Sequence, residues 1–338
     1  MRAHENIYIS SLTTMRLGGI ARHVIEIEKL EDISDAYGFA SQFNMPVFVL
    51  GAGANTLGHD EGYPGVIIIN RMRGIVEEPT ESGPVRLKIF GGEPWDAVVE
   101  YAVNKNLTGI EALSKIPGLA GAAPVQNIGA YGQQVSDVIT EVFVYDSVTY
   151  EFKTLTKPEL NFSYRKSLFN TSGKNRYFII SITIELRPGQ MPRPFYNSLE
   201  NYISEHKLTD FTPKGVREMV SQIRADKLPD PRTTASAGSF FKNVYIDDRA
   251  AEKAVEKGVP VHRSPYQNKV SSAWLIEQVG LKGKLLHGIR VSDKAPLVLI
   301  NESARSYNDL SKARAEIVSK VYDKFGYWLE QEPVELVA

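Results

Sequence analysis

Cysteine is absent from the 338-residue chain, which excludes disulfides, thiolate catalysis and cysteine-ligated metals. The formal net charge of -1 leaves no basic excess, so we expect no nucleic-acid partner. The sequence also lacks an apolar run long enough to span a membrane and the apolar core of a signal peptide. Its six histidines have no ligand-like spacing, so we predict no metal site. The default expectation is a cytoplasmic protein without an obligate protein partner.

The remaining composition is that of an ordinary globular protein, with 43% hydrophobic and 23% charged residues. Its length exceeds one typical domain, so two or three subdomains are expected. Short apolar or alternating runs predict strands at residues 23–27, 46–50, 65–69, 86–90, 142–148, 150–155, 177–186 and 296–300. Apolar residues at helical spacing predict helices around residues 30–43, 94–102, 216–223, 274–279 and 310–321. Asn308 is the expected N-cap of the last helix, and the prolines at 229 and 231 mark a domain boundary.

A first glycine-rich loop, Gly51–Thr56, follows the strand predicted at 46–50. It is not a Rossmann fingerprint, because the residues after Asn55 cannot open a regular helix. It is not a P-loop either, because the Gly-Lys-Ser/Thr ending is absent. The loop could still present backbone N–H groups to a phosphate, although an ordinary turn is about as good an interpretation.

A second and longer stretch, Ile116–Gln133, consists largely of glycine, alanine and proline. Such a segment offers little apolar area for a core, but its backbone can approach a ligand closely. Composition alone therefore indicates either a long surface loop or a seat for a flat or anionic ligand.

The order and spacing of short motifs add a resemblance. They are TMRLGG (14–19), the 51–56 loop, the 116–132 stretch, FSYRKS (162–167), KLPDP (227–231), AGSFFKN (237–243), AWLIEQ (273–278) and LVLIN (297–301). Over nearly its whole length the chain resembles the UDP-N-acetylenolpyruvoylglucosamine reductases (UDP-N-acetylmuramate dehydrogenases), flavoenzymes of peptidoglycan precursor synthesis. Tyr196 and the YRKS form are similar to the longer class of this family, which has a mobile tyrosine-bearing loop.

The resemblance implies an α+β fold of the vanillyl-alcohol-oxidase type, in which two FAD-binding lobes precede a separate α+β substrate-binding domain. The implied boundaries are residues 1–71 for the first lobe, 72–212 for the second and 213–325 for the substrate domain. The C-terminal strand, within 326–338, is expected to return to the first lobe.

The resemblance also implies the reaction, in which NADPH reduces the enolpyruvyl double bond of a small-molecule UDP-sugar and FAD passes the hydride. Arg165, Ser239 and Glu332 match the catalytic positions. A guanidinium suits a carboxylate on which charge develops, and serine is the expected proton donor to C2. Since serine is a weak acid in water, it would need a charged neighbour, for which the arginine is the nearest candidate. Glu332 would orient the site or share in stabilising the enol.

The matching positions also predict the binding residues. Those expected to line FAD are Gly51, Ala52, Gly53, Ala54, Asn55, Thr56, Pro117, Gly118, Gly121, Ala122, Ala123, Gln126, Asn127, Gly129, Ala130, Tyr131 and Gly132. Those expected to bind the nucleotide and diphosphate of the substrate are Tyr196, Lys227 and Asn243.

Taken without the family pattern, each catalytic candidate has an ordinary interpretation: a turn serine, a solvated arginine and an exposed glutamate near the C-terminus. The chain also departs from the pattern. Ala54 stands where serine is common, and Ala295 and Val334 stand where some members have a glutamine and an arginine that hold the substrate. Two alternatives remain open: a flavin oxidase or dehydrogenase of the same fold acting on another small molecule, and a non-enzymatic flavin-binding module.

Overall fold

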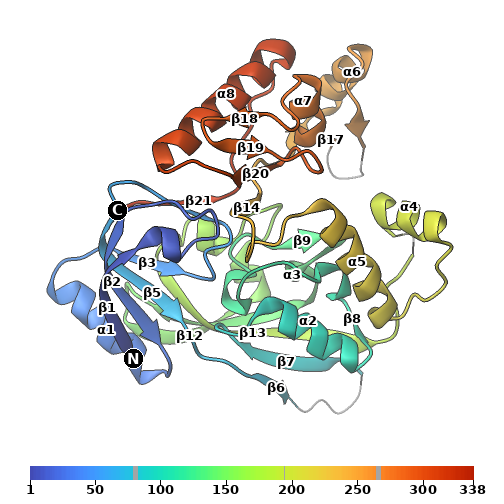
Figure 1. Cartoon of the computed structure of the whole chain (residues 1–338). Helices are drawn as coiled ribbons and strands as arrows, with labels where there is room; N and C mark the ends of the chain where they lie inside the picture. The colour runs from blue at the N-terminus through green and yellow to red at the C-terminus, as the bar shows by residue number, and fades with distance from the viewer. Residues whose placement is uncertain (79–82, 194, 264–267) are drawn as a thin grey trace. The chain divides into compact units, whose positions relative to one another are not determined.

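The computed structural model describes residues 1–78, 83–193, 195–263 and 268–338. By the density of its contacts the chain forms two compact units (Figure 1). Unit 1 comprises residues 1–6, 21–52 and 64–226, and unit 2 comprises residues 7–20, 53–63 and 227–338. The chain therefore passes between the units several times, and one passage lies inside the Gly51–Thr56 loop. The three-part division expected from the family stays a prediction.

Unit 1 contains a sheet with the strand order β1-β2-β5-β3, accompanied by one helix. Its elements are β1 (Arg2–Tyr8), β2 (Ile20–Ile27), α1 (Glu31–Gln42), β3 (Val47–Leu50) and β5 (Tyr63–Asn70). β3 and β5 pair in parallel, with Val47 opposite Val66. Ile33, Ala36 and Ala40 of α1 are buried and pack in one cluster with β2 and β5. The helix and three strands predicted here are confirmed, whereas β1 was not predicted because most of its side chains are polar and exposed.

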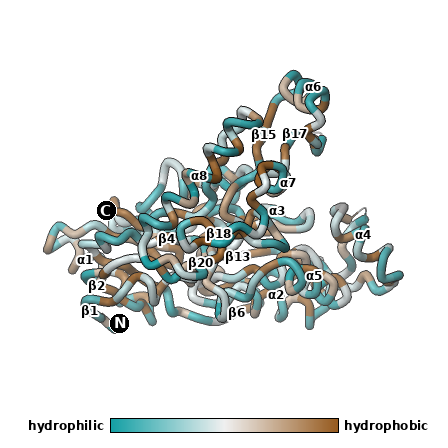
Figure 2. Tube along the Cα trace, turned by 45° about the horizontal axis from the view of Figure 1, so that its top comes forward, coloured by the Kyte–Doolittle hydropathy of each residue, from teal (hydrophilic) through white to brown (hydrophobic). Residues whose placement is uncertain are grey.

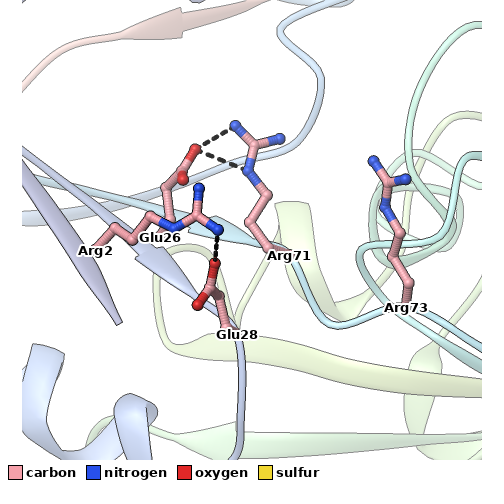
Figure 3. A pocket seen from close by; sticks show the side chains of 5 residues that line it. All are labelled: Arg2, Glu26, Glu28, Arg71 and Arg73. Atoms are coloured by element: carbon pink, nitrogen blue, oxygen red, sulfur yellow. Dashed lines mark hydrogen bonds and ion pairs between the residues drawn. The ribbon is translucent and has the colours of Figure 1, made fainter.

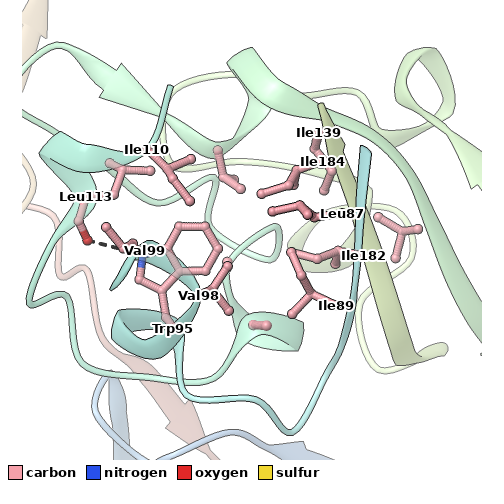
Figure 4. Packing of buried hydrophobic residues seen from close by; sticks show 14 of the residues in the cluster. Leu87, Ile89, Trp95, Val98, Val99, Ile110, Leu113, Ile139, Ile182 and Ile184 are labelled. Carbon is pink, nitrogen blue, oxygen red and sulfur yellow. Dashed lines mark hydrogen bonds between the residues drawn. The ribbon is translucent and has the colours of Figure 1, made fainter. Parts of the chain in front are cut away.

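A larger sheet of unit 1 has the order β12-β11-β13-β7-β6, and β8 also pairs with β13. The strands are β6 (Ile75–Glu78), β7 (Val85–Phe90), β8 (Leu107–Thr108), β11 (Ile139–Asp146), β12 (Glu151–Thr156) and β13 (Tyr177–Pro188). Helix α2 (Trp95–Asn104) contributes Trp95, which is 1% exposed and donates its indole N–H to the Leu113 carbonyl at 3.1 Å (Figure 4). The predicted hairpin at 142–155 is confirmed as β11 and β12, with β11 beginning three residues earlier.

The remaining elements of unit 1 include four of the predicted cofactor residues, namely Gly121, Ala122, Gly129 and Ala130. These elements are η2 (Glu111–Leu113), η3 (Ala120–Ala122), β9 (Gly129–Ala130), β10 (Gln133–Gln134), α3 (Val135–Val138), η4 (Lys157–Leu160), η5 (Leu168–Asn170), α4 (Asn197–His206) and α5 (Pro213–Lys227). The buried Arg217 fixes α5, because its guanidinium donates to both carboxylate oxygens of Asp96, at 2.7 and 3.0 Å. The pKa of Asp96 lies well below its ordinary value because these bonds and those from Lys115 outweigh the effect of burial.

Unit 2 is built on a sheet with the order β14-β20-β19-β18, a three-stranded sheet β15-β17-β16 and the pair β21-β4. The elements are η1 (Ile9–Ser11), β4 (Thr56–Gly58), β14 (Ser236–Ser239), β15 (Val244–Ile246), α6 (Asp248–Glu256), β16 (Val261–His262), β17 (Asn268–Val270), α7 (Ser272–Gln278), β18 (Leu285–Leu286), β19 (Ile289–Val291), β20 (Val298–Asn301), α8 (Tyr307–Phe325) and β21 (Val334–Leu336). Hydrophilic residues predominate along α6 (teal in Figure 2), whose buried positions are Ala251 and Ala254.

Helix α8 buries the face that its sequence spacing predicts, namely Leu310, Ala313, Ile317 and Val321. The predicted N-cap is wrong. Ser306 caps the helix instead: its hydroxyl accepts the Asp309 N–H at 3.1 Å, and the Asp309 carboxylate accepts the Ser306 N–H in return. Asn308 lies inside the first turn, where its own N–H is bound by the Asp60 carboxylate.

Within the described ranges, the helices are too short or too polar to cross a lipid bilayer.

The Asp146 carboxylate at the end of β11 is fully buried and is surrounded by donors. Arg176 donates to both of its oxygens, at 2.8 and 2.6 Å, and Lys153 and the Val148 N–H complete the set. The Arg176 bonds are the main reason that the pKa of Asp146 lies well below its ordinary value, even though burial opposes this. Such a group stabilises the fold above its unfolded pKa of about 3.9, and this stabilisation is lost as the pH falls toward its folded pKa.

We therefore expect Asp146→Asn to lower the free energy of unfolding by about 2 kcal/mol at pH 7, because two cations lose their shared partner. The difference between the variant and the parent should shrink as the pH falls below about 4. Urea unfolding followed by circular dichroism across this range measures both effects. Glu277→Gln, which removes an exposed ion pair with Lys282, is the matched control and should change stability little. A difference for Asp146→Asn that stays constant with pH would contradict this account.

Candidate flavin seat and active-site residues

The Gly51–Thr56 loop requires glycine at position 53. Gly53 has φ +67°, and a Cβ there would lie 2.0 Å from the Leu12 carbonyl oxygen. The Gly53 carbonyl accepts the Thr14 N–H at 3.0 Å, which joins the loop to the TMRLGG motif. The loop then enters the strand β4 rather than a helix, as expected from its sequence. A dinucleotide-binding Rossmann loop is therefore excluded by the geometry as well.

The Ile116–Gln133 stretch, which is part of unit 1, lies close to the backbone at Gly91. The Gly121 N–H donates to the Gly91 carbonyl at 2.9 Å, and a Cβ on Gly121 would lie 3.1 Å from the Gly91 Cα. A Cβ on Gly51 would lie 3.2 Å from the Cβ of Ala122. The two glycine-rich segments, which are far apart in the sequence, thus meet in unit 1.

Asn127 organises the second half of this stretch from a buried position. Its side chain accepts the Ser136 N–H at 3.1 Å and donates to the Ser163 carbonyl at 3.2 Å. Arg165 donates to the Gly129 carbonyl at 3.0 Å and to the Asn127 carbonyl at 3.4 Å. The structure therefore places Arg165 beside the predicted flavin seat, with its guanidinium braced by backbone carbonyls.

The end of the stretch carries an aromatic and cationic cluster. Tyr131 (φ +50°) and Gly132 (φ +90°) adopt left-handed backbone conformations, and a Cβ on Gly132 would lie 3.8 Å from the Tyr196 Cβ. Burial raises the pKa of Tyr131, while the charge and hydrogen bond of Arg224 oppose this. The pKa of Arg224 is lowered by its own burial, and its Nε has no partner among the described residues. Tyr196 and Tyr131 are thus brought together, and Arg224 joins them.

Sequence reasoning missed Arg224. The available signal was a charged residue directly after Ile223, on a helix whose apolar residues face inward.

Ser239 ends β14, where the pairing with β20 is irregular. Ser236 lies opposite Ile300 and Ser239 opposite Val298, with a register shift between them at Gly238 (φ +69°). Such a bulge redirects the side chain that follows it, and Ser239 is exposed although the next residue, Phe240, is fully buried.

Glu332 lies beside this strand through its backbone. The Glu332 N–H donates to the Phe240 carbonyl at 2.9 Å, and Phe241 and Gln331 form an antiparallel bridge. The Asn55 side chain donates to the Glu332 carbonyl at 3.5 Å, and the Val334 N–H donates to the Asn55 carbonyl at 2.9 Å. Unit 2 therefore gathers the segments of Asn55, Ser239 and Glu332, and Glu332 is half-buried rather than exposed.

Of the predicted substrate residues, Tyr196 belongs to unit 1, and Lys227 and Asn243 belong to unit 2. Tyr196 is 39% exposed, and Lys227 is the exposed last residue of α5. Asn243 is half-buried, and its side chain accepts the Ser272 N–H at 3.2 Å. Asn243 is thereby tied to the start of α7, whose sequence motif also belongs to the family pattern.

A charged pocket of unit 1 contains none of the predicted site residues. Arg71 grips the Glu26 carboxylate with two nitrogens, Arg2 pairs with Glu28 at 2.7 Å, and Arg73 completes the lining (Figure 3). Its charges largely compensate one another. Among the described residues, no group of three or more His, Asp or Glu side chains is arranged to hold a metal ion.

Comparisons with known proteins now bear on this geometry. A family model described as FAD binding domain matches residues 21–148, and one described as UDP-N-acetylenolpyruvoylglucosamine reductase, C-terminal domain, matches residues 230–336. The UDP-N-acetylenolpyruvoylglucosamine reductase of Aliivibrio fischeri is 35% identical over 311 residues, which cover 91% of this chain and 87% of that protein. The protein of the same name from Escherichia coli K12 is 34% identical over 315 residues, with 92% and 90% coverage.

Among solved structures, the UDP-N-acetylenolpyruvylglucosamine reductase of Thermus caldophilus has a TM-score of 0.66 at 23% identity and covers 99% of both chains, which shows the fold. The fold and the match to the FAD-binding domain define a flavin-dependent oxidoreductase, and the expected fold class is confirmed. The chain belongs to the UDP-N-acetylenolpyruvoylglucosamine reductase family, as its motifs indicated.

The residues present fit FAD. Gly51, Ala52, Gly121 and Ala122 leave the converging loops without bulky side chains, and no heavy atom lies within 4 Å of a Cβ added to Gly118. Backbone can therefore approach a flat or anionic group there. Within the predicted set, Gly53, Ala123 and Asn127 are buried.

We expect Gly53→Ala to lower the thermal midpoint and the amount of flavin bound per protein, because the added methyl cannot share space with the Leu12 carbonyl. Flavin absorbance per protein and thermal unfolding measure the two effects. Gly38→Ala is the matched control: the residue lies in α1 with no heavy atom within 4 Å, so the change should be neutral or stabilise by about 0.5–1 kcal/mol. Retention of the parent's flavin content by Gly53→Ala would argue against this loop as part of the seat.

Proposed function

We propose that this chain reduces UDP-N-acetylglucosamine enolpyruvate to UDP-N-acetylmuramate with NADPH, a step of peptidoglycan precursor synthesis. The observation that carries the proposal is identity of about one third with curated reductases over nearly their full length. The geometry within unit 2 supports it, since the segments of Ser239, Glu332 and Asn55 are hydrogen-bonded together. A cytoplasmic location and independence of other proteins belong to the same proposal.

The glycine-rich segments Gly51–Thr56 and Ile116–Gln133 would hold FAD, which would supply the hydride-transfer chemistry between NADPH and C3 of the enolpyruvyl group. The protein's part is to bind, orient and manage charge and protons. Negative charge then develops at C2 and on its carboxylate, so a preorganised positive group is needed before the reaction begins.

Arg165 suits that charge. A guanidinium is always protonated and presents several N–H groups in a planar fork. Its contacts to the Gly129 and Asn127 carbonyls use part of the fork and fix its orientation. We assign this guanidinium to the substrate carboxylate.

Ser239 is assigned as the proton donor to C2. The bulge at Gly238 presents its hydroxyl at the surface of unit 2, while the buried Phe240 anchors the backbone behind it. Glu332 is assigned to orient the reacting group, because its main chain is bonded to the same strand.

For the substrate's nucleotide and diphosphate we assign Tyr196, Lys227 and Asn243. An exposed lysine supplies positive charge for a diphosphate, and an exposed tyrosine offers a face for the base. Asn243 is held in place by α7.

Ser239→Ala should leave reduction of the flavin by NADPH unchanged and slow its reoxidation by the UDP-sugar by a factor of about 10²–10⁴. Rapid-mixing spectroscopy of each half-reaction makes the measurement. Ser303→Ala, at an exposed serine of the same unit, should behave like the parent. Equal losses in both half-reactions would rule out a proton-donor role.

Arg165→Lys keeps the charge but loses the fork, so kcat/KM for the UDP-sugar should fall by a factor of about 10²–10³. The control is Lys166→Ala, at the exposed neighbouring residue, which should change kcat/KM by less than about twofold. An unchanged kcat/KM in Arg165→Lys would remove this residue from the site.

Assays of NADPH oxidation and of flavin binding distinguish the alternatives. NADPH oxidation that does not depend on the enolpyruvyl UDP-sugar, together with turnover of an alcohol, would indicate an oxidase or dehydrogenase of the same fold. Protein that stays colourless after addition of FAD would indicate no flavoenzyme at all.

A further inference from the structure

Helix α8 sends one arginine to the C-terminal segment. Nη1 of Arg314 donates to the Gln331 side-chain oxygen at 2.6 Å and to the Glu335 carboxylate at 2.7 Å, while Nη2 donates to the Ser311 hydroxyl at 3.2 Å. The side chain of Arg314 is 27% exposed, so these bonds are only partly screened by water. One guanidinium thus grips two residues that stand on either side of Glu332.

Both gripped residues are themselves fixed. The Gln331 amide donates to the Pro333 carbonyl at 2.8 Å, so a hydrogen bond joins the residues on either side of Glu332. Glu335 lies in β21 opposite Leu57 of β4, and the Tyr307 hydroxyl donates to its carboxylate at 2.5 Å. Burial alone would raise the pKa of Glu335, but the bonds from Tyr307 and Arg314 outweigh it and lower that pKa, which keeps the carboxylate ionised.

Three further residues, Tyr307, His59 and Asp60, support the contacts of Arg314. The Tyr307 ring stacks on His59 with 3.7 Å between ring centroids. The Arg314 guanidinium lies over the Tyr307 ring, 5.9 Å from its centroid. Asp60, next to His59, accepts the Tyr307 N–H at 2.7 Å. Arg314 therefore acts from a helix whose first turn is itself bound to the chain before β5.

The main chain of Glu332 is already held by Phe240 on one side and by Asn55 on the other. Further main-chain bonds, from the Lys242 N–H to the Glu330 carbonyl and across the Phe241–Gln331 bridge, hold the same segment. The side chains of Gln331 and Glu335 add a second attachment, because they tie the residues before and after Glu332 to α8.

We propose that Arg314 is a positioning residue, which holds the direction of the Glu332 side chain through Gln331 and Glu335. The proposal rests on the function proposed above, in which Glu332 acts on the substrate. Arg314 itself has no contact with substrate in this account.

The test compares Arg314→Ala with Arg314→Lys in the full-length flavin-loaded enzyme. Arg314→Ala should slow reoxidation of the reduced flavin by UDP-N-acetylglucosamine enolpyruvate about tenfold or more and leave its reduction by NADPH within about twofold. Arg314→Lys should recover part of the loss, since one ammonium can reach Gln331 or Glu335 but lacks the planar fork.

Arg290→Ala is the matched control. Arg290 forms a similar two-nitrogen pair with Glu302 in unit 2, and its Nη1 donates to the Gly283 carbonyl at 2.9 Å. It should lower thermal stability comparably but leave both half-reactions within about twofold. If Arg314→Ala behaves like Arg290→Ala, Arg314 has a structural role only and the proposal is overturned.

A double-mutant cycle with Glu332→Gln separates this proposal from the function on which it rests. If Arg314 acts through Glu332, Arg314→Ala should slow the enzyme much less in the Glu332→Gln background than in the parent. Equal losses in both backgrounds would overturn the positioning role and leave the proposed function intact. A parent-like Glu332→Gln would instead remove Glu332 from the reaction, and with it the basis of the inference.

Gln331→Ala keeps the test decisive if Arg314→Ala does not fold. It removes the hydrogen bond to the Pro333 carbonyl and one of the two bonds from Arg314 to the C-terminal segment, while the pair with Glu335 remains. It should produce a smaller loss in the same half-reaction, and a parent-like rate in this variant and in Arg314→Lys would overturn the proposal.

Discussion

Hydrogen bonds at the Glu332 backbone join three parts of unit 2 that are distant in the sequence. The strand ending at Ser239 binds the Glu332 N–H through Phe240, and the glycine loop binds the Glu332 carbonyl through Asn55. One of these partners is a main-chain carbonyl and the other is the Asn55 side chain. The bond to Phe240 joins two main chains, so it does not depend on which side chains stand at these two positions.

The long elements could be predicted because their burial leaves a period in the sequence. α8 shows its buried face at Leu310, Ala313 and Ile317, and β13 shows a long apolar run. The pair β4 and β21 could not be predicted in the same way, because strands of three residues are too short to show alternation. The prediction of Asn308 as the cap of α8 is wrong because Ser306 and Asp309 form a capping box two residues earlier.

The candidate site also has parts that could be predicted from the sequence and parts that could not. The glycine loop and the Gly/Ala stretch are visible in composition, whereas the catalytic roles of Arg165, Ser239 and Glu332 are predicted only from the family resemblance. The Arg224–Tyr131 contact and the Arg314 network depend on side chains that meet through folding, and no local pattern encodes them. The sequence shows only that Arg224 and Arg314 are charged residues within amphipathic helices, which does not predict their partners.

The segments of unit 2 are far apart in the sequence, and this constrains the order in which the chain can fold during synthesis. Its early segments, residues 7–20 and 53–63, find their partners in Ser236, Tyr307 and β21. The parallel strand that pairs with β4 is β21, which comes about 280 residues later in the chain. The edge of β4 is therefore covered only after β21 has left the ribosome, whereas most of unit 1 is complete once residue 226 has emerged. A nascent or truncated chain that stops short of Val334 exposes the unpaired edge of β4 and is open to pairing with other chains.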